Sequence, residues 1–139
     1  MDVVIDTNVV ISGLLFGGLP GRIVTLWQKQ IIIPYVSKEI IDEYVRVLAY
    51  PKLKLTQQEI EYVLYQEILK YCEIITPRSD IQIVSDDPAD DMFIHCAQAK
   101  SIDTIISGDR HLLALKTYKS ISILPSADFL QKYNLQQMD

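Results

Sequence analysis

The chain has 139 residues, which suits one compact domain spanning residues 1–139 and is too short for two ordinary ones. Hydrophobic residues make up 49% of it, so an intrinsically disordered chain is excluded. Thirteen Lys+Arg against 18 Asp+Glu give a net charge of −5 and a pI near 4.9, which argues against binding duplex nucleic acid through a basic surface.

The apolar pattern alternates short β-rich runs with longer helical ones. In the first half of the chain it predicts strands over 3–5 and 31–33, the second closed by Pro34, and helices over 21–29, 38–49 and 57–72. In the second half it predicts a short apolar run at 74–75, strands over 104–106 and 121–124, and helices over 88–100, 110–115 and 126–133. Ser37 marks one helix start, and Thr56 with Glu59 forms a capping-box pattern at the next.

Strands that are apolar throughout and separated by helices indicate a parallel sheet covered on both faces. We therefore predict a single α/β domain with a Rossmann-like, three-layer arrangement around a central parallel sheet. In such sheets functional groups collect beyond the carboxyl ends of the strands, where the strand order reverses.

The two cysteines and the absence of a long apolar run bear on the compartment. Cys72 and Cys96 lie in apolar stretches and have no disulfide or zinc spacing, as is typical of buried thiols in a reducing compartment. No apolar run approaches the roughly 18 residues of a membrane span, and the acid at Asp2 does not suit a signal peptide. We expect a cytoplasmic protein with no membrane association.

Acidic residues follow two of the predicted strands. Asp6 comes directly after the run 3–5, and Asp109 ends the Ser-Gly-Asp that follows 104–106. A third acidic stretch, SDDPADD at 85–91, leads into a helix, whose free N–H groups keep carboxylates ionised. Each acid alone is more often a turn or cap residue. Their convergence on one sheet edge is what indicates a functional site.

Several ionised carboxylates in one cleft repel each other unless a cation lies between them. Oxygen-only ligands suit Mg²⁺ or Mn²⁺. Glu43 and Asp42 lie on opposite borders of the apolar face of their helix, so periodicity leaves open which of them joins such a site. His95 and His111 have no zinc spacing; we expect His95 to be structural, whereas His111 could contact a substrate.

Four segments together resemble the motifs of PIN-domain nucleases, in the same order and spacing across essentially the whole chain. They are DTNVVIS at 6–12, SKEIIDEY at 37–44, DPADDMF at 87–93 and SGDRHLL at 107–113. The chain is most similar to bacterial PIN proteins of the VapC type, the toxin components of toxin–antitoxin systems. The resemblance implies a PIN-domain fold and an endoribonuclease that cuts single-stranded RNA with one or two Mg²⁺ or Mn²⁺ ions. It also implies a homodimer and a cognate antitoxin protein.

The family's acidic quartet carries over, as catalytic residues and metal ligands, to Asp6, Glu43, Asp90 and Asp109. It is the family register that selects Glu43 over Asp42. We expect Asn8 to hold Asp6 or contact phosphate, Ser107 to be a hydrogen-bonding neighbour, and Arg110 to contact phosphate. Asp91 stands where relatives often have Asn; it either adds a fifth carboxylate or caps its helix, and we expect the cap.

Two other α/β classes are disfavoured by residues in view. A phospho-receiver domain needs an acidic pair after its first strand and a lysine after its last, and a haloacid-dehalogenase-type phosphatase needs Asp-x-Asp; here the first strand is followed by Asp6-Thr7-Asn8 and the last by Pro125-Ser126. The remaining alternative is a non-catalytic PIN-fold scaffold. The acidic quartet argues against it, because carboxylates gathered in one site repel each other and would be costly to keep without a metal. The four predicted ligands account for four of the five net negative charges, so the low pI does not count against an RNA substrate.

Overall fold

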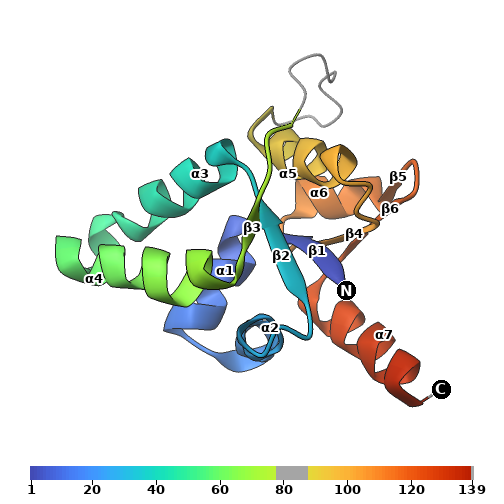
Figure 1. The fold of residues 1–139 in the computed structure, drawn as a ribbon, viewed down its shortest axis with the longest axis horizontal. Helices are drawn as coiled ribbons and strands as arrows, with labels where there is room; N and C mark the ends of the chain where they lie inside the picture. The colour runs from blue at the N-terminus through green and yellow to red at the C-terminus, as the bar shows by residue number, and fades with distance from the viewer. Residues whose placement is uncertain (78–87, 139) are drawn as a thin grey trace.

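A six-stranded sheet forms the centre of the computed structural model, which describes residues 1–77 and 88–138 apart from the side chains of 88–90 and 135–138 (Figure 1). The strand order is β3-β2-β1-β4-β6-β5. The strands are β1 (Asp2–Ile5), β2 (Ile33–Val36), β3 (Glu73–Ile74), β4 (Thr104–Ile106), β5 (Thr117–Tyr118) and β6 (Ile121–Leu124). Every neighbouring pair is parallel except β5 and β6, which form an antiparallel pair at one edge.

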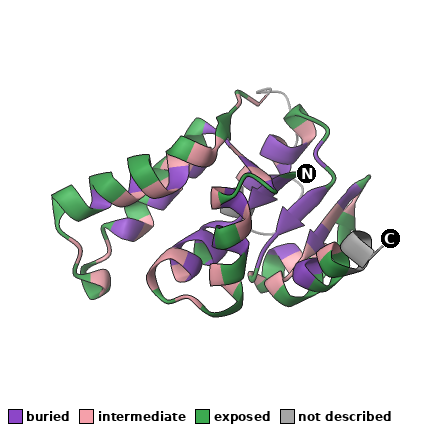
Figure 2. Ribbon diagram, turned by 60° about the horizontal axis from the view of Figure 1, so that its bottom comes forward, coloured by how far each residue is buried: buried purple, intermediate pink, exposed green. Residues whose placement is uncertain are grey.

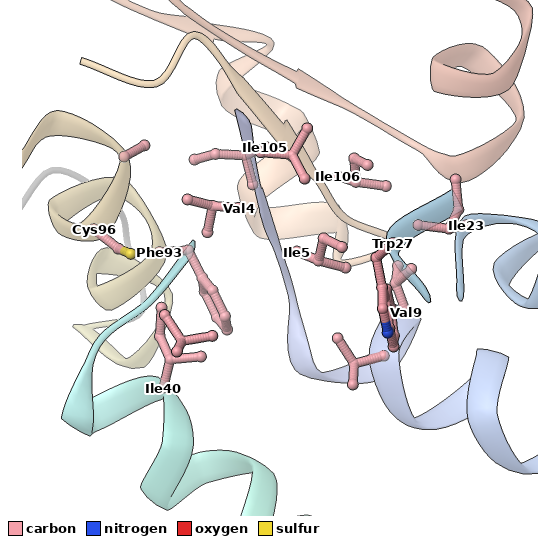
Figure 3. Close-up of a cluster of buried hydrophobic side chains, with 14 of the residues drawn as sticks. Val4, Ile5, Val9, Ile23, Trp27, Ile40, Phe93, Cys96, Ile105 and Ile106 are labelled. Carbon is pink, nitrogen blue, oxygen red and sulfur yellow. The ribbon is translucent and has the colours of Figure 1, made fainter. Parts of the chain in front are cut away.

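Helices cover both faces of this sheet (Figure 1). They are α1 (Thr7–Leu15), α2 (Gly18–Gln28), α3 (Lys38–Leu48), α4 (Gln57–Tyr62), α5 (Pro88–Ala99), α6 (Arg110–Leu115) and α7 (Ser126–Met138). Side chains alternate across a strand, and Figure 3 shows the result at β1: Val4 lies toward Phe93 and Cys96 of α5, whereas Ile5 lies toward Trp27 of α2. The predicted three-layer α/β arrangement with a parallel centre is confirmed.

Buried residues form a continuous hydrophobic core along the strands and on the helix faces turned toward them (Figure 2). Trp27, Tyr44 and Phe129 are the largest side chains that are fully buried in it. No single helix among the described residues is long and apolar enough to cross a membrane; only α1 and α2 taken together, as a pair bent by 94°, pass that test of length and composition.

The strand predicted over 31–33 is displaced in the structure. β2 begins at Ile33 and runs through Pro34, so the expectation that Pro34 closes this strand is wrong. Pro34 has no N–H to donate, and the pairing of β2 with β3 begins one residue later, at Tyr35. Ile33 N donates to Met1 O at 2.8 Å, which sets the register with β1. An apolar run alone cannot reveal this choice of register.

The helix over 7–15 and the edge strand β5 were not anticipated from the sequence. α1 begins directly after β1 and turns into α2 at Gly17 and Gly18, whose φ values of 77° and 67° favour glycine. The helix predicted over 57–72 forms with its capping box but is composite: α4 continues as a π-helix over Val63–Ile68 and a 3₁₀ turn over Leu69–Tyr71. In the π-helical part the Glu67 carbonyl accepts from the indole Nε1 of Trp27 at 3.2 Å.

Candidate active site

Asp6 occupies the first position after β1 and is the N-cap of α1. Its Oδ1 accepts a hydrogen bond from Val9 N at 2.9 Å, and its Oδ2 accepts from Gly108 N at 3.2 Å and from the Ser107 hydroxyl. The residue is only 3% exposed. The strand end, the helix start and the neighbouring loop therefore hold this carboxylate in one orientation.

Asp109 occupies a similar position after β4, as the N-cap of α6. Its Oδ1 accepts from His111 N at 2.8 Å and from Leu112 N at 3.2 Å. Ser107 joins the two acids, because its hydroxyl donates to Asp6 Oδ2 and accepts from Asp109 N at 3.0 Å. Both acids are thus helix caps and also members of one hydrogen-bonded cluster.

The strand order explains why these residues meet. β1 and β4 are adjacent and parallel, and Asp6 N donates to Ile106 O at 2.9 Å. The chain passes from β1 to β2 on one side and later places β4 on the other side of β1. The cluster therefore lies at the point where the strand order reverses, which is where α/β sheets bind ligands. Asp6 and Asp109 therefore follow neighbouring strands, which the sequence alone left open.

The electrostatics of the cluster favour a bound cation. Burial raises the pKa of Asp6 above its usual value, and the negative charge of Asp109 raises it further. Hydrogen bonds from Ser107, Val9 N and Gly108 N oppose this rise. A carboxylate has about four acceptor sites, and Asp109 Oδ2 accepts no hydrogen bond from the described residues. The donor set is therefore hard oxygen with free lone pairs, which fits Mg²⁺ or Mn²⁺.

Glu43, on α3, is engaged elsewhere. Its carboxylate forms a bidentate ion pair with Arg46, with Arg46 Nη2 at 2.6 Å from Oε1 and Nε at 3.0 Å from Oε2. No hydrogen bond in the described part of the chain joins Glu43 to Asp6 or Asp109. The structure thus places Asp6, Ser107 and Asp109 together and holds Glu43 on the Arg46 side chain. The metal-ligating role of Glu43 stays a prediction.

The helix α5 carries the remaining predicted acids. The side chain of Asp90 lies outside the described residues, as do Asp86 and Asp87. Asp91 is the fourth residue of α5, which begins at Pro88, so it is not the residue that precedes the helix, and its expected capping role stays a prediction. Its side chain turns into the protein, where it is 2% exposed. Among the described side chains no three of His, Cys, Asp and Glu gather as a metal site, and the metal-ligating role of Asp90 stays a prediction.

The supporting residues differ in exposure. Asn8 and Arg110 are both exposed, each within two residues of an Asp of the cluster. Asn8 is not among the three groups that hold Asp6, which leaves contact with phosphate as its predicted role. His111 is exposed and His95 is half-buried in α5.

Two residues near the cluster were not identified as functional from the sequence. Tyr44, which reads as one more apolar-face position of α3, donates its hydroxyl to Ile5 O at 2.9 Å and so ties α3 to the carboxyl end of β1. Burial raises the pKa of the Tyr44 hydroxyl well above its ordinary value. Thr7 is buried beside Asp6, and its Oγ1 has no hydrogen-bond partner in the described part of the chain. A buried hydroxyl without a partner costs free energy, so a further polar group that bonds to the Thr7 hydroxyl at this strand end would be stabilised.

Comparison with known families identifies the fold around this cluster. Residues 2–111 match the model of the PIN domain. The chain belongs to the PIN-domain family. Protein MJ1680 of Methanocaldococcus jannaschii is 34% identical over 118 residues, covering 82% of this chain and 74% of that protein.

Solved structures share this PIN-domain fold. The VapBC2 complex of Rickettsia felis, determined with a DNA fragment from its promoter, matches with a TM-score of 0.59 and 14% identity over 88% of this chain and 97% of the matched chain. The PIN domain endonuclease Utp24 matches with a TM-score of 0.53 and 17% identity over 88% of this chain and 82% of that chain. At these identities the likeness concerns the fold. Membership of the PIN family, together with the clustered acids, supports nuclease chemistry.

Proposed function

We propose that this PIN-domain protein is an endoribonuclease that hydrolyses single-stranded RNA with Mg²⁺ or Mn²⁺. The observation that carries the proposal is the pair of acids, Asp6 and Asp109, bridged by Ser107 at the strand-order reversal of the sheet. Burying a carboxylate beside a second carboxylate is costly. A bound divalent cation would offset that cost, whereas a scaffold would have no use for it.

The proposed roles follow from how each side chain is held. Asp6 and Asp109 would ligate the cation with their remaining oxygen lone pairs, Asp90 would complete the site from α5, and Glu43 would orient a water at its edge. A divalent cation bound there supplies charge neutralisation at the phosphate and an acidified water. The hydrogen bond from Ser107 favours the ionised form of the Asp6 carboxylate by lowering its pKa and holds it in one orientation, and Asn8 and Arg110 would contact the RNA phosphates from the exposed side.

The toxin assignment is a further part of the proposal. Its support is the resemblance of the sequence motifs to the VapC type and the fold shared with a chain of a VapBC2 complex. We propose that the chain forms a cytoplasmic homodimer and is inhibited by a separate antitoxin protein. The test of the nuclease proposal is cleavage of a panel of single-stranded and duplex RNAs, with Mn²⁺ and with EDTA. Cleavage of single strands that requires Mn²⁺ supports it.

Mn²⁺ is expected to raise the melting temperature of the protein in a pH-dependent way. The pKa of Asp6 is raised in the folded state, so protonated Asp6 stabilises the metal-free protein. This stabilisation is fully present below the pKa that Asp6 has in the unfolded chain, and it is lost as pH rises through the pKa of Asp6 in the folded protein. Metal binding needs the deprotonated carboxylate, so the stabilisation by Mn²⁺ grows over that same rise. At about 100 times the dissociation constant, binding adds about 2.7 kcal/mol. Thermal unfolding from about pH 4 to pH 8, with Mn²⁺ and with EDTA, measures both trends. A Mn²⁺ effect that stays constant across this range would contradict the assignment of Asp6.

Ser107→Ala is expected to reduce cleavage by about 10- to 100-fold, the usual loss when a group that supports a metal ligand is removed. The hydroxyl lowers the pKa of Asp6, so the acidic limb of the pH–rate profile should also move to higher pH. Asp109 N loses its acceptor, which costs about 1–3 kcal/mol of stability. Ser120→Ala, at an exposed position between β5 and β6, is the matched control. A pH–rate profile that does not move in Ser107→Ala would show that the hydroxyl has only a structural role.

A further inference from the structure

Arg46 connects Glu43 to a neighbouring aromatic ring. Its Nη2 and Nε bind the Glu43 carboxylate, while its Nη1 donates to Tyr50 Oη at 2.8 Å. Its Cζ also lies 5.6 Å from the centre of the Tyr50 ring. The guanidinium is therefore oriented by three groups, although the side chain of Arg46 is 60% exposed, against 22% for Glu43.

Lys52 brings a second positive charge to the same ring. Its Nζ lies 5.9 Å from the centre of the Tyr50 ring. In the described part of the chain, the carboxylate of Glu43 is paired with Arg46, and Lys52 has no ion pair. Cations near an aromatic ring are attracted by its face. Tyr50 thus gathers two exposed cations beside one carboxylate, an arrangement with one positive charge that no carboxylate in it balances.

Arg46 lies on α3, the helix that is tied to the strand end bearing Asp6. Tyr44, one residue after Glu43, holds α3 against the carboxyl end of β1 through the carbonyl of Ile5, the residue before Asp6. With a net charge of −5, the protein must rely on local cations to hold a polyanion. Arginine suits this task because its planar fork binds carboxylate and phosphate in the same bidentate way.

We propose that Arg46 and Lys52, gathered on the Tyr50 ring, bind a phosphate of the RNA backbone, and that Arg46 exchanges its ion pair with Glu43 for this phosphate. The inference rests on the proposed function, because it concerns the RNA substrate of the same site. An exposed ion pair is worth little, about 0–1 kcal/mol, so a phosphate can displace it. Release of Glu43 then leaves its carboxylate available at the edge of the cluster. Binding of RNA and availability of Glu43 are thereby coupled, and such coupling is reciprocal.

The test measures binding of a single-stranded RNA of about 12 nucleotides by fluorescence anisotropy, in EDTA and over a range of salt. Asp6→Asn protein is the reference, so that cleavage does not interfere. In this background Arg46→Gln and Lys52→Gln are each expected to weaken binding several-fold and to reduce the slope of log K against log salt by about 0.7, the value for one phosphate contact to a single strand. Arg46→Lys, which keeps the charge, should retain most of the slope.

Glu43→Gln is expected to change the RNA affinity in the direction opposite to Arg46→Gln and Lys52→Gln. It frees Arg46 from its carboxylate partner and is expected to strengthen RNA binding several-fold. The matched control for Arg46→Gln is Lys38→Gln, because Lys38 Nζ also pairs with a carboxylate of the same helix, that of Asp42, at 3.2 Å. This control removes the same charge and should leave the affinity within about twofold. A melting temperature for each variant shows that the fold is kept, and Lys52→Gln, at an exposed side chain, tests the site without disturbing α3.

The outcomes separate the inference from the proposed function. A reference protein that binds RNA equally well with Arg46→Gln and Lys52→Gln overturns the inference alone, and so does an equal loss in Lys38→Gln. Weaker RNA binding by Glu43→Gln overturns the exchange of partners. A reference protein with no affinity for single-stranded RNA, together with no cleavage by the wild type, overturns both.

Discussion

Asp6→Asn is expected to abolish Mn²⁺-dependent cleavage of single-stranded RNA, with a loss well beyond the about 100-fold typical of residues that only support a metal ligand. The Asp6 carboxylate is placed at the strand-order reversal by three hydrogen bonds and lies beside Asp109. Replacement of its charge by a neutral amide removes a ligand that the cation requires. The measurement compares initial cleavage rates of the two proteins on the same RNA with Mn²⁺.

The fold should survive this replacement. An amide has one acceptor oxygen, so it can serve Val9 N or Gly108 N but not both, which costs about 1–3 kcal/mol. Removal of a buried negative charge opposes that loss. Far-UV circular dichroism and the melting temperature in EDTA check the fold, and the stabilisation by Mn²⁺ should disappear.

Asp42→Asn is the matched control, because it makes the same change of charge as Asp6→Asn but at an exposed position of α3. It should keep the wild-type rate. Full activity of Asp6→Asn, purified free of host nuclease, would refute the proposed site. A wild-type protein that neither cleaves the RNA panel nor gains stability from Mn²⁺ would favour the scaffold alternative. Induced expression reads out the toxin part of the proposal: growth arrest should follow from the wild type and not from Asp6→Asn.

Gly13→Ala is expected to destabilise the protein by about 1–3 kcal/mol, the usual cost of an overpacked contact, although alanine is the better helix former. A Cβ at Gly13 would lie 2.6 Å from the backbone oxygen of Pro20 and 2.6 Å from Cγ2 of Val24. These atoms belong to α2, so α1 and α2 must move apart. Because Asp6 is the N-cap of α1 and accepts a hydrogen bond from Val9 N of that helix, the cleavage rate should fall as well. Thermal unfolding should show a decrease of several degrees.

Gly21→Ala is the matched control for this prediction. A Cβ at Gly21 would lie 3.6 Å from Gly13 O, an ordinary van der Waals distance, and the gain in helix propensity is up to about 1 kcal/mol. The Gly21 variant should therefore be as stable as the wild type or more so. An unchanged melting temperature for Gly13→Ala would show that the two helices separate without cost.

Much of the fold could be predicted because its signals are local. Ser37, and Thr56 with Glu59, mark helix starts by hydrogen bonds within one turn, and the structure has these bonds. α1 carries the same type of signal, since Asp6 accepts from Val9 N. The helix was not predicted, although an acid after a strand is often a cap residue. Capping of α1 and a place in the site are compatible roles for Asp6.

Other features depend on contacts that no local pattern encodes. The register of β2 depends on Met1 O and on the late start of the pairing with β3. Tyr44 reads as a core position, yet its hydroxyl binds the Ile5 carbonyl 39 residues away. The ion pair of Arg46 with Glu43 does have a sequence signal, the i,i+3 spacing on a helix. Its link to Tyr50 and Lys52 requires the turn after α3.

For this protein the sequence by itself determined the class of fold, the family and the acids that follow the strands, because periodicity, caps and motif spacing are properties of short segments. The tertiary structure decided which of those acids meet. Ser107 and Asp6 are 101 residues apart and bind each other only because β4 lies next to β1. It also decided that Glu43 binds Arg46 and that the side chain of Asp91, the fourth residue of α5, is buried. These are results of strand order and helix packing, in which free energy depends on partners distant in the chain.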